Sequence, residues 1–96
     1  MRYFHRTSIS IDEAVAAADE FFGQRMQGTG SQGRHREFRH ASGSVTVDVR
    51  AEGGHYTLIT VETDKVGESE VDKLAKRFLS EVHTKVHEEH HVRGAY

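Results

Sequence analysis

The chain has 96 residues, a formal net charge of −2 and no cysteine. This length predicts one domain spanning residues 1–96, and the lack of cysteine excludes disulfides, thiol nucleophiles and thiolate metal sites. The small negative charge gives no reason to expect nucleic acid or a membrane surface as a partner. Because the sequence has neither an apolar run of about 18 residues nor a secretory signal pattern, we expect a cytoplasmic protein.

The low apolar content bears on oligomeric state. Only 35% of the residues are hydrophobic, which is low for a globular chain and indicates a lean core. A small domain of this kind gains stability when a second copy buries more of its apolar surface. We therefore expect a homo-oligomer, with a dimer favoured.

The first third of the chain predicts a strand, a helix and a glycine-rich connection. Residues 2–9 alternate as in a strand, and Ser10 with Glu13 has the form of a helix capping box. Apolar residues then recur at helical spacing to about Met26. The next segment, QGTGSQG at 27–33, matches the letters of the dinucleotide fingerprint, which functions only between a strand and a following helix. We therefore expect a flexible connection there.

Three strands are predicted next, at about 34–41, 44–51 and 55–63. Ser42-Gly43 and Gly53-Gly54 suit two-residue hairpin turns, which would pair Phe38 with Val47 and Val49 with Leu58. With this register, one sheet face is largely apolar and packs against the helices. The opposite, polar face collects Glu37, Arg39, Asp48, Arg50, Ile59 and Val61.

The last quarter of the chain predicts one long helix, from Ser69 as N-cap to about Arg93. Its apolar stripe comprises Val71, Leu74, Ala75, Phe78, Leu79, Val82 and Val86. The full prediction is an α+β domain of topology β-α-β-β-β-α, with both helices on one face of a four-stranded antiparallel sheet. The first strand lies beside the last, which gives the strand order 1-4-3-2.

This order of elements resembles a minimal helix-grip domain of the START and pollen-allergen type, and also half of a TATA-binding-protein-like domain. The segment YFHRTSISIDEAV at 3–15 looks like the first strand and helix start of small cyclase-like helix-grip proteins. The resemblance implies a ligand pocket between the sheet and the C-terminal helix. Its lining would include Arg36, Phe38, His40 and Tyr56. The resemblance carries over no catalytic residue.

The long helix also carries His83, His87 and His91 at four-residue spacing. Two imidazoles four apart on a helix can chelate one divalent ion. His83 and His91 lie about 12 Å apart along the axis, so one ion cannot reach all three. A complete site needs another ligand, such as His5, His40 or a residue from another subunit. The sequence predicts no cofactor and favours adventitious Zn²⁺ or Ni²⁺ binding over a specific metal role.

The polar sheet face is the candidate interaction surface. Two arginines and two carboxylates surround Ile59 and Val61, which would lack an apolar partner within the chain. The sequence therefore favours a non-enzymatic binding or assembly domain that self-associates through this face or through the C-terminal helix. Two alternatives stay open: a helix-grip binder or enzyme for a small molecule, and divalent-metal binding through the histidines.

Overall fold

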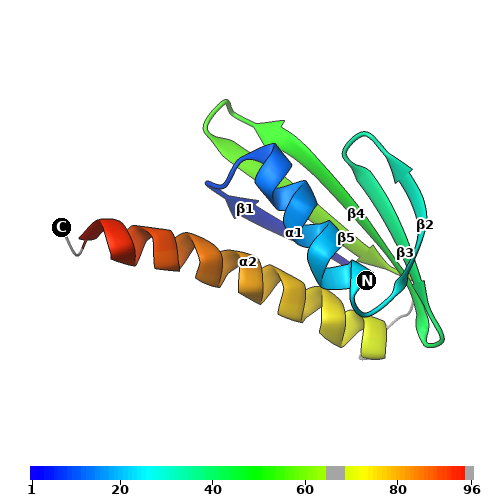
Figure 1. Cartoon of the computed structure of the whole chain (residues 1–96). Coiled ribbons are helices and arrows are strands. Elements are labelled where there is room, and N and C mark those ends of the chain that lie inside the picture. Colours follow the sequence, from blue (N-terminus) through cyan, green and yellow to red (C-terminus); the bar gives the residue numbers. More distant parts are fainter. Residues whose placement is uncertain (65–68, 95–96) are drawn as a thin grey trace.

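The computed structural model describes the backbone of residues 1–64 and 69–94, and the side chains of residues 1–64 and 69–84. Its elements are β1 (Arg2–Thr7), α1 (Ile11–Gly23), β2 (Gln27–Gln32), β3 (His35–His40), β4 (Gly43–Glu52), β5 (Tyr56–Thr63) and α2 (Glu70–Gly94). The strands form one antiparallel sheet in the order β1-β5-β4-β3-β2, and both helices lie on the same side of it (Figure 1). The α+β class and the antiparallel sheet are confirmed, whereas the predicted four strands are wrong because the sheet has five.

Both helices begin at the serines that the sequence indicates. The Ser10 hydroxyl accepts a hydrogen bond from the Glu13 amide at 3.1 Å, and Ser69 accepts one from the Asp72 amide at 3.2 Å. Each bond satisfies an amide that has no partner within the first turn of its helix. Beyond the end of α1, Arg25 donates to the Phe21 carbonyl at 2.8 Å.

The additional strand is β2, in the segment predicted to be a flexible connection. It pairs antiparallel with β3, and its register shifts between Gly28 and Gly30 at a bulge. Three of the residues in QGTGSQG are glycine, so the segment lacks the β-branched and aromatic pattern by which strands are recognised. The strand depends instead on backbone pairing with β3, and Gly33, with φ 59°, makes the tight turn between them.

The hairpin between β3 and β4 differs from its predicted register by two residues. Phe38 pairs with Val45 rather than with Val47, because the turn is placed one position earlier, at Ala41 and Ser42. A shift of two residues keeps every side chain on its predicted face, since side chains alternate with a period of two. The faces predicted for β3 and β4 are therefore confirmed.

The hairpin between β4 and β5 is shifted by one residue, which has a larger consequence. Glu52 pairs with Tyr56, so the loop holds three residues, and Gly53 and Gly54 adopt φ values of 65° and 77°. Val49 consequently pairs with Ile59 instead of Leu58. A one-residue shift moves every side chain of a strand to the other face of the sheet.

The prediction that Ile59 and Val61 lie on the polar face is therefore wrong. Both side chains are fully buried, at 0% exposure, between the sheet and the helices. Tyr56, Leu58 and Thr60 take the opposite face. The two apolar residues that were expected to form an interface, Ile59 and Val61, are therefore part of the core.

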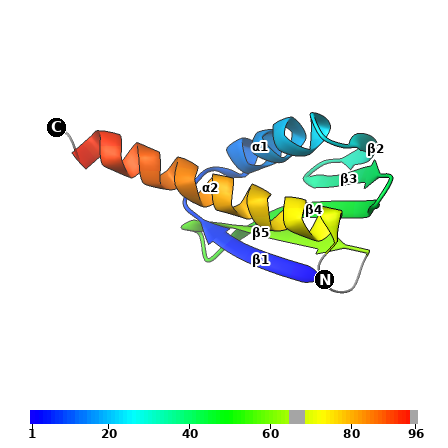
Figure 2. The same ribbon diagram turned by 90° about the horizontal axis from the view of Figure 1, so that it is seen from below.

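The core fills the space between the sheet and the two helices. α2 lies over β1, β5 and β4, while α1 lies over β4, β3 and β2 (Figure 2). Phe22 is at the centre, with its ring 5.0 Å from the rings of Phe21 and Phe78 and 5.2 Å from that of Phe38. Small buried residues on α1, Ala14 and Ala18, allow this helix to pack close to the sheet.

Candidate functional site

The sheet face opposite the helices is the broadest surface on which function could reside. Among the described elements, none packs against this face (Figure 2). We call it the open face. It comprises Arg2, Phe4 and Arg6 of β1, Tyr56, Leu58, Thr60 and Glu62 of β5, Thr46, Asp48, Arg50 and Glu52 of β4, and His35, Glu37 and Arg39 of β3.

The centre of the open face is apolar. Tyr56, Leu58 and Thr60 follow one another along β5, and Phe4 on β1 lies directly beside Thr60. Leu58 is only 8% exposed, because Arg6 and Arg50 lie on either side of it in register. Phe4 and Tyr56 are 61% and 52% exposed, respectively. Exposed aromatic side chains on one sheet face are a typical feature of protein contact surfaces.

Charged residues of both signs surround this apolar centre. Arg6 pairs with Glu52 at 2.8 Å, and Arg2 approaches Glu62 at 3.4 Å. The face carries equal numbers of formal positive and negative charges, from Arg2, Arg6, Arg39 and Arg50 and from Glu37, Asp48, Glu52 and Glu62. These exposed pairs contribute little to folding, about 0–1 kcal/mol each, so their main effect is on what the face can contact.

His35 lies between two carboxylates at the β3 side of the open face. Its Nδ1 is 2.7 Å from Asp48 and its Nε2 is 3.1 Å from Glu37. The hydrogen bond to Asp48, followed by the weaker contribution of Glu37, raises the pKa of His35 above its ordinary value. Gly30 leaves room for this arrangement, since a Cβ atom there would lie 3.1 Å from the Glu37 carboxylate.

This environment predicts how pH affects the contribution of His35. A raised folded-state pKa means that the stabilisation is complete below about pH 6.5 and is lost as pH rises through the folded-state pKa. We expect replacement of His35 by glutamine to cost no more than about 1 kcal/mol at pH 5.5, because the pairs are exposed, and less at pH 8.5. Urea denaturation of both proteins at the two pH values measures this difference. A difference that stays constant or grows with pH would contradict the assignment.

The predicted interface residues are only partly brought together. Glu37, Arg39, Asp48 and Arg50 lie on the open face as predicted, whereas Ile59 and Val61 belong to the core. Phe4 was not predicted as a site residue, although the alternation of side chains along β1 could have indicated its position on this face. Phe4 falls on the same face of that strand as Arg2 and Arg6.

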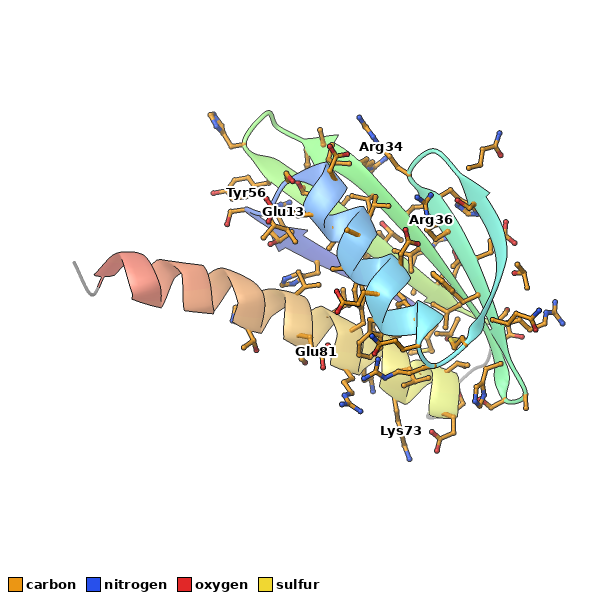
Figure 3. The ribbon with its side chains drawn as sticks, in the orientation of Figure 1. Glu13, Arg34, Arg36, Tyr56, Lys73 and Glu81 are labelled. Atoms are coloured by element: carbon orange, nitrogen blue, oxygen red, sulfur yellow. The ribbon has the colours of Figure 1, made fainter. Side chains whose placement is uncertain are left out.

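The four predicted pocket residues do not line one cavity. Phe38 is buried in the core, and Arg36 reaches α1, where its Nε lies 2.9 Å from Asp19 (Figure 3). His40 is exposed at the β3–β4 turn. Tyr56 is on the opposite side of the sheet, at the start of β5, because of the register of the last hairpin. The pocket predicted from this set is therefore not formed.

A groove does occur between the two helices, where sequence reasoning placed none. Its volume is about 410 Å³. Phe21, Phe78 and Val82 provide buried apolar surface, and the lining also includes Glu20, Arg25 and Glu81. Apolar residues on two facing helices were the only sequence signal for it, and that signal equally fits ordinary core packing.

β1 and α2 meet along a polar seam, which we define by Tyr3 and His5 on β1 and Asp72, Lys76 and His83 on α2. The Tyr3 hydroxyl donates to Asp72, and Lys76 lies 3.3 Å from the other carboxylate oxygen. The side chain of Asp72 is 1% exposed. The pKa of Asp72 is lowered mainly by the hydrogen bond from Tyr3 and to a smaller extent by Lys76. This cluster fixes the start of α2 against the first strand.

The other end of the seam brings two histidines together. The rings of His5 and His83 have centroids 5.9 Å apart and planes at 78°. Burial lowers the pKa of His5, and the nearby His83 lowers it further. The side chains of His87 and His91, which the sequence indicated as further ligands, lie outside the described residues. Among the described side chains, no group of three or more histidine, aspartate or glutamate residues could hold a metal ion.

None of the helices in the described ranges is both long enough and apolar enough to cross a membrane. Comparison of the sequence with models of known protein families, and with curated proteins, finds no match.

Proposed function

We propose that this chain is a non-enzymatic assembly domain whose open face binds the open face of a second copy. The observation that carries the proposal is the exposure of Phe4 and Tyr56 on either side of Leu58, on a sheet face that no described element covers. Pairing two such faces would bury these aromatics, and aromatic side chains contribute disproportionately to the stability of protein interfaces.

The distribution of charge favours a second copy over a polyanionic partner. Four arginines are balanced by four carboxylates on the open face, so it lacks the basic excess that nucleic-acid binding requires. A two-fold axis parallel to the strands, passing over the boundary between β5 and β4, would place β1 of one copy over β3 of the other. Arg2 and Glu37 lie at the same level of the sheet, because Arg2 pairs with Glu62, Glu62 with Thr46, and Thr46 with Glu37. The two-fold operation would therefore place Arg2 of each copy against Glu37 of the other.

The size of the face indicates how strong this association should be. The open face spans four strands about 4.8 Å apart, each with roughly six residues at 3.3 Å, which gives a projected area on the order of 400 Å². Stable protein complexes bury about 800 Å² of accessible surface on each partner. The face is smaller than such an interface, so we expect a weak, reversible association.

Sedimentation equilibrium from low micromolar to near-millimolar concentration tests the proposal. We expect a reversible monomer–dimer equilibrium, which Phe4→Glu weakens at least about tenfold because a buried charge replaces an aromatic contact. Lys73→Glu is the control, since Lys73 is exposed and extends from α2 away from α1 (Figure 3).

Two results would count against the proposal. A wild-type protein that stays monomeric at the highest concentration removes the dimer altogether. A dimer that Phe4→Glu leaves intact and Lys73→Glu weakens moves the interface to the C-terminal helix, which is the other route to assembly.

A second candidate function is the binding of a small apolar molecule, and the groove between α1 and α2 favours it. Its volume of about 410 Å³ falls within the usual range for ligand sites, and its buried surface is aromatic and aliphatic. The helix-grip resemblance also implies a ligand, although beneath the helix rather than between the two helices.

Nile red fluorescence is a direct test of the groove. We expect Ala17→Phe, which fills the groove, to reduce dye affinity at least about tenfold relative to the wild type. Ala41→Phe, in the exposed β3–β4 turn, should leave affinity unchanged. Equal affinity in all three proteins would exclude this groove as the binding site.

A further inference from the structure

We propose that His5 and His83 are two ligands of a divalent transition-metal site, suited to Zn²⁺ or Ni²⁺, that links β1 to α2. The site is independent of the assembly proposed above, because the seam lies on the helix side of the sheet and the open face on the other. It also differs from a chelate within one helix, since its two ligands come from opposite ends of the chain.

The separation of the two rings is the main geometric argument. Two imidazoles that bind one zinc ion through nitrogens at about 2.0–2.1 Å have ring centres about 5–6 Å apart. The centroids of His5 and His83 are 5.9 Å apart, with their planes at 78°. The ring spacing of this pair therefore matches that of two imidazoles bound to one ion.

The strand position of His5 lies beside a buried part of the sheet. On β5 the residue paired with His5 is Ile59, whose side chain is fully buried.

The backbone on each side of the pair is held in place. β1 is hydrogen-bonded to β5 along its whole length, and Tyr3 and Asp72 attach the start of α2 to the same strand. Preorganisation of this kind reduces the entropy lost when an ion is bound. Two protein ligands leave the remaining positions to water, so we expect micromolar rather than tighter affinity.

Calorimetric titration of Zn²⁺ into the apo protein tests the site. We expect saturable binding in the wild type and in His55→Ala, whose histidine lies in the exposed β4–β5 loop. His5→Ala and His83→Ala should each bind at least about tenfold more weakly, because each removes half of the protein ligand set. His5→Gln preserves size and polarity, and is used in parallel in case the alanine variant does not fold.

Thermal unfolding gives a second readout. Zn²⁺ bound to the native state alone raises the melting temperature, so we expect an increase in the wild type and none in His5→Gln. Two outcomes would overturn the proposal: no saturable binding in the wild type, or binding by His5→Gln equal to that of the wild type. The second outcome would mean that α2 holds the ion without help from β1.

Discussion

Replacement of Ile59 by alanine should lower the free energy of unfolding by about 2–5 kcal/mol, because a fully buried side chain leaves a cavity. Ile59 is 0% exposed and is paired with His5 on one side and Val49 on the other. The total stability of a small domain is only about 5–15 kcal/mol, so much of it would be lost. Urea denaturation followed by circular dichroism measures the change.

The adjacent residue provides a matched control. Thr60 lies on the open face and is only partly buried, so Thr60→Ala should cost no more than about 1 kcal/mol. The register predicted from the sequence exchanges the two positions, with Thr60 in the core and Ile59 on the surface. A larger loss for Thr60→Ala than for Ile59→Ala would therefore show that the observed register, and the open face built on it, are wrong.

Replacement of Phe22 by alanine should cost about 3–5 kcal/mol, since it removes the aromatic ring at the centre of the core. The ring has 0% exposure and touches Phe21, Phe38 and Phe78. Phe22→Leu keeps most of the volume and should cost distinctly less. Chemical denaturation of the three proteins under one set of conditions provides the comparison.

The same variant tests whether the interior is already filled. A helix-grip ligand would lie between the sheet and α2, where the Phe22 and Phe78 rings are now in contact at 5.0 Å. Phe22→Ala creates an apolar cavity at that place, so added benzene should stabilise this variant more than it stabilises the wild type. Stabilisation of the wild type that persists with Ala17→Phe, which fills the α1–α2 groove, would instead show that a cavity exists in the native core.

The parts of this fold that depend on local chemistry could be predicted from the sequence. Ser10 and Ser69 cap helices because a serine at the N-cap accepts a hydrogen bond from the amide three residues further on. The long helix follows from the periodicity of its apolar residues. The pairing of the first strand with the last was predictable because the last strand is apolar on both faces, which is typical of a central strand.

The register of β5 could not be decided in this way. Two glycines allow either a two-residue or a three-residue loop, and both faces of the strand carry apolar residues. Glu62 was the available signal, because the predicted register points it towards the core beside Leu58 and Thr60. The observed register places Glu62 at the surface, beside Arg2. It places the β-branched residues of the strand, Ile59 and Val61 among them, in the core.

The histidines show a different limit. Helical spacing relates His83 only to residues on its own helix, whereas its contact with His5 depends on how α2 crosses β1. The edge strand β2 was missed because its stability comes from backbone pairing, which leaves little trace in side-chain pattern. Tertiary contacts of both kinds require the packed structure.

The most direct test of assembly through the open face is a dilution series followed by ¹H–¹⁵N NMR. Assembly through this face predicts that amide shifts change with concentration along β1 and β5, at Phe4, Arg6, Tyr56, Leu58 and Thr60, while the amides that line the α1–α2 groove stay fixed. Spectra that do not change with concentration, or changes confined to α1 and α2, would contradict it.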